Sequence, residues 1–382
     1  MRKQFEGALV ITSLLLLTFT ACTKKDIITR PVPIPDQEDS TGNPRNPPAP
    51  PVQTQFAVSL KAFVEVGSVM YDSIPANITV TSWDSANIAY TQELDLEPGA
   101  NQVKLEKKYP KFRFRLHTWG VDKTMDYTRE QLQEGLPVVI GGKREPKTLR
   151  GESTWLLIQG EYRIQSRIDY HYNGNGSLNT IDYHQKKPQS ADLLHYWTDH
   201  FYYNGSQVTR ITRHDENNKP VIFTDFTYTG SGFLLNIEQD SYGNKTYAYV
   251  QQGADTEHEI VEVDFLFDNG QAMTSSMKFK NGNKVSETAT SSTGAGEGGT
   301  FQYDHHINPY HQLNWPDMYF RNSSKNNPLT VDKGYSGAIP SVVIYKTVYT
   351  YDNDGYPMQV IKSYKSGGTG EHLYDRKTLY FY

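Results

Sequence analysis

Apolar and polar residues alternate with a period of two in three segments of the N-terminal third of the chain, 56–66, 77–81 and 112–117. This period places the apolar side chains on one face of a β-strand and the polar ones on the other. We therefore predict that all three segments are half-buried strands.

Two local signals punctuate these strands. Pro98–Asn101 has the composition of a turn, and Thr128 with Gln131 forms a capping box for one short helix that ends near Gly135. Strands at this spacing predict a β-sandwich of immunoglobulin-like or transthyretin-like type over residues 54–146.

A second pattern fills residues 151–382 and is clearest at Tyr349–Ile361, which combines alternating tyrosines, an Asp-Gly turn and returning aliphatic residues. Aromatic residues at alternate positions line one face of a strand, and Asn-Gly or Asp-Gly supplies the positive φ of a tight turn. Looser copies of this unit begin at Tyr170, Phe201, Phe226, Phe265, Phe279 and Phe301.

The spacing between copies varies from about a dozen residues to nearly fifty, so the repeat is degenerate. It predicts an antiparallel β-meander or barrel-like sheet of hairpins over residues 151–382. The fold class expected for the whole chain is all-β.

The Tyr-x-Tyr-Asp-x-x-Gly pattern of Tyr349–Gly355 resembles the YD repeats of RHS-type proteins, which form spiral β-shells. The combination of Phe301–Asp304, Asn308–Tyr310 and Ser324–Pro328 with that copy resembles Bacteroidetes lipoproteins that carry a repeat domain of unknown function predicted to be porin-like. The resemblance covers roughly residues 155–382. It implies an architecture and a location, and it implies no catalytic residue. The chain differs from RHS shells in length and copy number, which argues against a cage that encloses a toxin.

The N-terminus has the organisation of an export signal. Arg2 and Lys3 precede an apolar run over Ala8–Thr20 that is too short to span a bilayer comfortably. The segment that ends at Cys22 resembles the lipobox of bacterial lipoproteins, although Phe19 replaces the usual leucine. We predict a signal peptide over residues 1–21 and a lipid anchor on Cys22; the alternative is an ordinary secretory signal with an incidental cysteine.

Residues 22–53 are predicted to form a tether, because Pro31–Pro51 is rich in proline and has almost no apolar periodicity. Together with the anchor, the tether predicts an outer-membrane lipoprotein. Display at the cell surface and display on the periplasmic face both remain open.

Composition narrows the chemistry further. Cys22 is the single cysteine, so its lipidation would leave no thiol for a disulfide, a zinc site or a nucleophile. The net charge of −5 comes without a basic patch and argues against a nucleic-acid partner.

No motif indicates a cofactor. Gly294–Gly299 fits G-x-G-x-x-G, but no helix follows it to hold a pyrophosphate, so we predict a flexible loop there. Asp352 and Asp354 are weak candidates for a calcium site because the acidic ligand expected downstream is missing. We expect them to form a turn.

Polar residues at His195, Asp199, His200, His214 and Asp215 are interpreted as belonging to exposed strand faces, and no residue is predicted to be catalytic.

Aromatic residues give the remaining signal. The candidate ligand contacts are Trp197 and Tyr310 together with Trp315 and Tyr319. Aromatic residues on strands are usually core or cross-strand pairs. The functional alternative is a stacking platform for sugar rings or a protein-contact patch.

The leading functional hypothesis is an exported, lipid-anchored envelope protein that binds a glycan or a partner protein without catalysis. The alternatives are a hydrolase that acts on polysaccharide and a purely structural envelope component. The expected partners are the membrane, through the N-terminal lipid, and a glycan or an envelope protein.

Overall fold

The computed structural model of the chain describes residues 53–187, 190, 192–228, 234–240, 242–313, 324–336, 341–366 and 373–382. They belong to one compact unit that spans residues 53–382. The predicted signal peptide and Cys22, together with nearly all of the predicted tether, lie outside the described residues.

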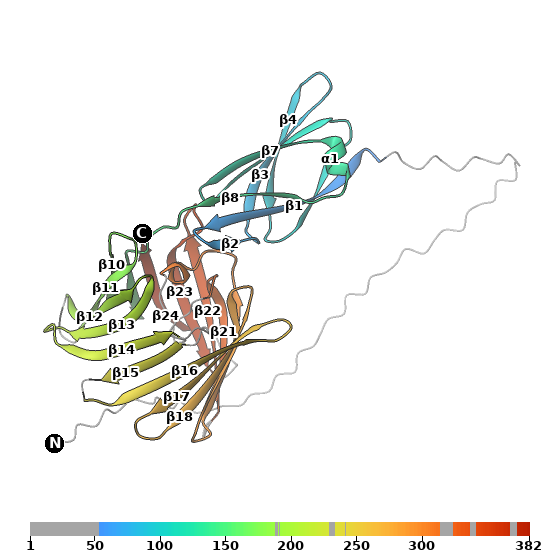
Figure 1. Ribbon diagram of the computed structural model, residues 1–382. Coiled ribbons are helices and arrows are strands. Elements are labelled where there is room, and N and C mark those ends of the chain that lie inside the picture. The colour runs from blue at the N-terminus through green and yellow to red at the C-terminus, as the bar shows by residue number, and fades with distance from the viewer. Residues whose placement is uncertain are drawn as a thin grey trace, which may run out of the picture. The chain divides into compact units, whose positions relative to one another are not determined.

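The N-terminal part contains two four-stranded sheets (Figure 1). In the first sheet, β1 pairs antiparallel with β2 and β5 and parallel with β8; the second sheet has the order β4-β3-β6-β7. The elements are β1 (Gln55–Val66), β2 (Val69–Tyr71), β3 (Ala76–Trp83), β4 (Ala89–Leu96), β5 (Asn101–Glu106), β6 (Lys111–Thr118), β7 (Val121–Thr128), α1 (Arg129–Gln133) and β8 (Val138–Arg144).

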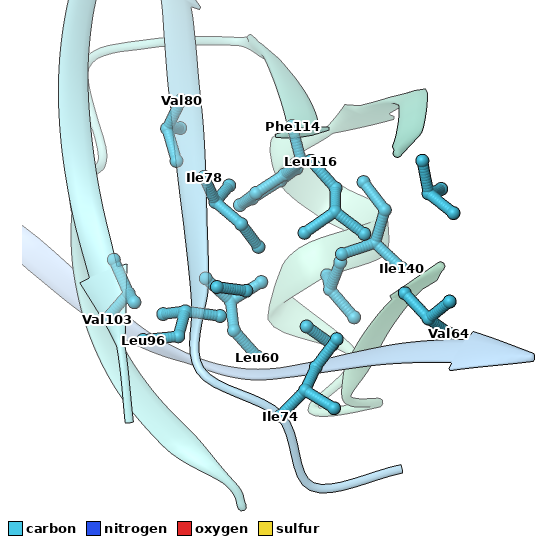
Figure 2. Packing of buried hydrophobic residues seen from close by; sticks show 14 of the residues in the cluster. Leu60, Val64, Ile74, Ile78, Val80, Leu96, Val103, Phe114, Leu116 and Ile140 are labelled. Atoms are coloured by element: carbon cyan, nitrogen blue, oxygen red, sulfur yellow. The ribbon is translucent and has the colours of Figure 1, made fainter. Parts of the chain in front are cut away.

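Both sheets contribute alternate side chains to one core, as the period of two predicts (Figure 2). Leu60 and Ile140 come from the first sheet, and Ile78, Phe114 and Leu116 come from the second; each is fully buried. The three strands predicted from alternation are therefore confirmed as β1, β3 and β6. The immunoglobulin-like or transthyretin-like assignment stays a prediction.

The predicted capping box is also confirmed. The Thr128 hydroxyl accepts a hydrogen bond from the Gln131 amide, and the Gln131 side chain accepts one from the Thr128 amide. Glycine at 135 has a φ of 78° just after α1. The helix begins and ends where the sequence indicates.

The C-terminal part is a closed antiparallel barrel of sixteen strands (Figure 1). Each strand pairs with the next one in the chain, and β24 pairs with β9 to close the ring. The elements are β9 (Gly151–Ile158), β10 (Glu161–Tyr172), β11 (Leu178–Lys186), β12 (Leu193–Asn204), β13 (Gln207–Asp215), β14 (Pro220–Tyr228), β15 (Leu234–Asp240), β16 (Lys245–Ala254), β17 (Glu259–Phe267), β18 (Ala272–Lys280), β19 (Asn283–Ser291), β20 (Gly296–Tyr303), η1 (Pro309–Gln312), β21 (Pro328–Ser336), β22 (Ser341–Tyr351), β23 (Pro357–Ser366) and β24 (Leu373–Phe381).

The all-β class and the antiparallel meander are therefore confirmed, and the meander closes into a barrel. Tight turns such as Asn204-Gly205, Asn281-Gly282 and Asp352–Gly355 connect consecutive strands, as the repeat pattern predicts. Whether these hairpins are related to YD repeats stays a prediction.

Alternate residues of a closed barrel face its interior and its exterior. Cross-strand partners share a face, so Tyr170↔Ile181 and Phe201↔Ile211 lie on the same wall as the buried cluster of the barrel, which also contains Leu313 from the segment between β20 and β21. We call this wall the inner face and the opposite wall the outer face.

The outer face carries charged pairs. Arg210 on β13 and Asp225 on β14 form a bidentate ion pair there, with about half of each side chain exposed. On β13 and β14 the outer face is therefore polar.

The segment between β20 and β21 contributes to one end of the barrel, which we call the tyrosine end. There Tyr172 donates to the Leu149 carbonyl over 2.6 Å, Tyr356 donates to Gln312 over 2.7 Å, and Tyr351 binds Asp304. The turns between β9 and β10, β13 and β14, and β17 and β18 lie at the opposite end, which we call the far end.

Candidate functional site

The inner face of β11–β13 brings aromatic and charged side chains together. The register places Tyr183 opposite Trp197 and Asp199 opposite Arg213, so all four share one wall. Glu238 on β15 reaches the same wall through its pairing with Thr224. We call these five residues the aromatic–arginine cluster.

The arginine is the centre of this cluster. Its Nε and Nη2 donate to the two carboxylate oxygens of Asp199 over 2.7 and 2.8 Å. The guanidinium carbon lies 4.5 Å from the centre of the Trp197 ring and 5.5 Å from that of Tyr183, and the two rings meet edge to face. The planar cation is thus fixed by a carboxylate and two aromatic faces.

The ion pair is well shielded from water, since Asp199 is only 2% exposed. Burial opposes the charge on Arg213, but the hydrogen bonds and charge of Asp199 outweigh it and raise the guanidinium pKa. Because Arg213 engages both oxygens of Asp199, this acid is occupied in positioning the arginine.

Glu238 lies in a different environment. Its side chain remains exposed, yet desolvation on the wall raises its carboxyl pKa against the opposing effect of Arg213. The indole Nε1 of Trp197 is buried and has no hydrogen-bond partner among the residues that the structure describes. A carboxyl group with a raised pKa and an indole N–H without a partner can both form hydrogen bonds with a ligand.

A second charged group lines the inner face of β19–β21. The Glu287 carboxylate forms ion pairs with Lys284 over 2.5 Å and with Lys333 over 2.8 Å. The Nζ of Lys284 also lies 4.6 Å from the centre of the Phe301 ring. Burial opposes ionisation of Glu287, but the two lysines outweigh it and lower its carboxyl pKa. Eight strand steps separate β13 from β21, half of the ring, so this group and the aromatic–arginine cluster belong to opposite walls.

The candidate ligand contacts predicted from the sequence have different fates. Trp197 belongs to the cluster. Tyr310 is half-buried at the tyrosine end, where its hydroxyl binds Glu152 and its ring packs edge to face on Tyr380. Trp315 and Tyr319 lie outside the described residues.

Asp352 and Asp354 are held by a cation of the chain itself. Lys147 Nζ lies 2.6 Å from a carboxylate oxygen of each, and Asp352 also accepts the backbone amides of Asp354 and Tyr356. The predicted turn is confirmed. No group of three or more potential metal ligands gathers within the described ranges.

Two interpretations from the sequence are wrong. Asp199 is not on an exposed strand face; it faces inward, because its register pairs it with Ile181 and Arg213. The glycine-rich stretch is not a loop throughout, because Gly296–Gly299 belong to strand β20 and pair with β19 and β21.

The outer face of β10–β13 carries five histidines. The rings of His200 and His214 lie closest, with their centres 4.5 Å apart. His171 lies 2.9 Å from Asp182, and His195 lies 2.9 Å from Thr198. His184 lies 3.6 Å from Asp169. Burial and the neighbouring His214 lower the pKa of His200, against the opposing effect of Asp182 and Asp199.

The lowered pKa of His200 predicts that the free energy of unfolding falls in acid. An unfolded histidine has a pKa of about 6.5, so below that pH the unfolded chain binds a proton that folded His200 resists, and stability falls as the pH drops. We expect the free energy of unfolding to decrease between pH 7.5 and 5.5, and to decrease less in a His200→Gln variant. Urea denaturation at the two pH values measures both. His214→Gln should act in the same direction, and an unchanged pH dependence in both variants would contradict the assignment.

No family model matches the chain, and no curated protein matches it either. Among solved structures, the chain is similar to a porin-like protein from Bacteroides uniformis, with 14% identity, a TM-score of 0.43 and coverage of 62% of this chain and 98% of that one. It is also similar to a porin-like protein from Bacteroides vulgatus, with 9% identity, a TM-score of 0.34 and coverage of 62% and 99%.

None of the helices in the described part of the chain has the length and apolarity needed to cross a bilayer.

Proposed function

We propose that the chain is an exported, lipid-anchored envelope protein that binds a glycan, without catalysis, at the aromatic–arginine cluster inside the barrel. The observation that carries this proposal is the pairing of Trp197 and Tyr183 with the fixed Arg213–Asp199 ion pair on one concave wall.

The chemistry of the cluster suits a sugar. Aromatic rings pack on the C–H faces of a pyranose, while carboxyl and guanidinium groups exchange hydrogen bonds with its hydroxyls. Ligand sites typically combine such an apolar or aromatic lining with a few oriented polar groups. The Glu238 carboxyl, whose pKa is raised, and the indole Nε1 of Trp197, which has no partner among the described residues, add hydrogen-bonding groups beside the rings.

The same cluster favours binding over hydrolysis. Glycoside cleavage uses two carboxyl groups in separate roles, one as acid and the other as nucleophile or base. Within the cluster, both carboxylate oxygens of Asp199 accept hydrogen bonds from Arg213. Glu238 therefore has no second carboxyl group in the cluster that is available for catalysis. The concave position also favours an oligosaccharide over a folded partner protein.

Anchoring follows from the predicted signal, the lipobox at Cys22 and the proline-rich tether. Two or more acyl chains on that cysteine would give stable attachment, whereas one chain alone binds a membrane only marginally. The proposed location is the outer membrane, on its cell-surface or periplasmic side.

A screen of the folded protein against a glycan array tests the proposal. We expect binding to a subset of oligosaccharides and no release of reducing ends from those glycans on prolonged incubation. If protein shown to be folded by its cooperative unfolding bound no glycan on the array, the proposal would be contradicted. Turnover of a bound glycan would contradict the non-catalytic part of the proposal.

A further inference from the structure

The outer face of the barrel is chemically asymmetric. On β18–β21 its described side chains are mainly small and polar: Thr274, Ser276, Lys278, Lys280, Ser286, Thr288, Thr290, Thr300, Gln302, Thr330 and Asp332. On the neighbouring wall made by β22, β23, β24, β9 and the first half of β10, most are apolar: Val342, Ile344, Val348, Ile361, Leu379, Phe381, Trp155, Leu157, Ile164 and Tyr162. We call this second set the apolar outer face.

The register shows that these residues form one continuous surface. Val348 pairs with Ile361, Ile361 with Lys377, Lys377 with Trp155, and Trp155 with Ile164, so one row crosses five strands. Large parts of it reach solvent, since Val348 is 67% exposed and Phe381 is 46% exposed. Exposed apolar patches of this kind mark interaction surfaces.

Three lysines accompany the apolar residues. Lys346, Lys365 and Lys377 point outward on β22, β23 and β24, and the described outward positions of these strands and of β9 include no carboxylate. Lys377 Nζ lies 5.3 Å from the centre of the Trp155 ring and 4.6 Å from that of Tyr162. Lysine stems and aromatic rings combined in this way are typical of side chains at a membrane interface.

We propose that the apolar outer face lies against an anionic phospholipid surface. The lysines complement negative headgroups, and the Trp, Tyr, Val and Ile side chains can enter the boundary between headgroups and acyl chains. The polar wall of β18–β21 makes the contact one-sided. Charge complementarity with a lipid leaflet favours this occupant over a folded protein.

The length of the tether allows this contact. Roughly thirty residues separate Cys22 from the first described residue, and a proline-rich chain of this length would span on the order of 90 Å if extended, which is enough for the barrel to approach the membrane. Only this step rests on the proposed lipid anchor; the affinity of the wall for lipid does not.

Vesicle sedimentation of residues 22–382 with Cys22→Ser tests the proposal without an attached lipid. We expect the protein to bind vesicles of phosphatidylcholine with about a third phosphatidylglycerol much more tightly than pure phosphatidylcholine. A Lys346→Gln/Lys365→Gln/Lys377→Gln variant should lose on the order of 100-fold in affinity, because each of the three interfacial lysines contributes about 1 kcal/mol.

Two further variants decide the outcome. Val348→Ser/Phe381→Ser should weaken the binding that survives in high salt, and the matched Lys278→Gln/Lys280→Gln variant on the polar wall should bind as the parent does. The proposal is overturned if the parent does not bind anionic vesicles, or if the Lys278/Lys280 variant loses as much affinity as the triple variant. Because the vesicle assay contains no glycan, a lack of vesicle binding would not affect the glycan-array result. A lack of glycan binding on the array would likewise not affect the vesicle result.

Discussion

Replacing Asp199 by alanine is expected to lower the free energy of unfolding by about 3 kcal/mol, because removing one partner of a shielded ion pair leaves the other charge without compensation. The Asp199 side chain is 3% exposed and that of Arg213 is 23% exposed, so water cannot easily replace the lost carboxylate. Equilibrium urea denaturation of the parent and the variant measures the difference.

The outer face provides a matched control for this change. Arg210 and Asp225 have the same bidentate geometry, over 2.5 and 3.0 Å, but their side chains are 50% and 43% exposed. Pairs in contact with solvent contribute at most about 1 kcal/mol, so Asp225→Ala should have a small effect. Equal losses in the two variants would mean that Asp199 does not face a protected interior.

The second large effect is expected from Gly355→Ala. Gly355 has a φ of 79°, and an added Cβ would lie 2.5 Å from the Trp119 ring. Trp119 is buried and packs on Tyr71 and His306, so it cannot easily move away. The left-handed backbone costs roughly 1–2 kcal/mol for alanine and overpacking costs typically 1–3 kcal/mol, so we expect a total loss of about 3 kcal/mol.

Gly205→Ala separates the two contributions. Gly205 has a φ of 61° in another hairpin turn, and a Cβ added there would meet no atom within 4 Å. Only the backbone cost applies at this position, and we expect a loss of about 1 kcal/mol. Thermal or urea denaturation of both variants provides the comparison. If Gly355→Ala were no more destabilising than Gly205→Ala, the close approach of Trp119 would be wrong.

Local patterns in the sequence predict local structure well. The capping box at Thr128 predicts α1, and alternation over residues 56–66 predicts β1, because both signals depend on neighbours in the chain. The aromatic repeat predicts hairpins for the same reason. Closure of the barrel depends on β24 meeting β9, more than 200 residues earlier in the chain, and no local pattern encodes that pairing.

The orientation of individual side chains is harder to predict, because one extra residue in a strand moves every later side chain to the other face. Register shifts occur between Ile164 and Ser166 and between Tyr202 and Tyr203. The first turns Ile164 outward while Ile168 faces inward, and the second sets which residue meets Asp199. Without the second shift, the hairpin of β12 and β13 would place Thr212 opposite Asp199 in place of Arg213.

The candidate site was therefore only partly predictable. Trp197 is identifiable as a candidate because it belongs to an aromatic cluster in the sequence. Arg213, Tyr183 and Glu238 carry no motif, and only their shared wall reveals them. Trp315 and Tyr319 lie outside the described residues and stay predictions.

The central claim is that a glycan binds inside the barrel at Trp197. Isothermal titration calorimetry with a glycan identified on the array tests it directly, using the parent, Trp197→Ala and Trp155→Ala. Both tryptophans lie on strands, are half-buried and have a cation over the ring, but one faces inward and the other outward.

We expect Trp197→Ala to weaken binding on the order of tenfold or more, since central aromatic contacts usually contribute at least about 2 kcal/mol, and Trp155→Ala to bind as the parent does. Parent-like affinity in Trp197→Ala, or an equal loss in Trp155→Ala, would contradict the account.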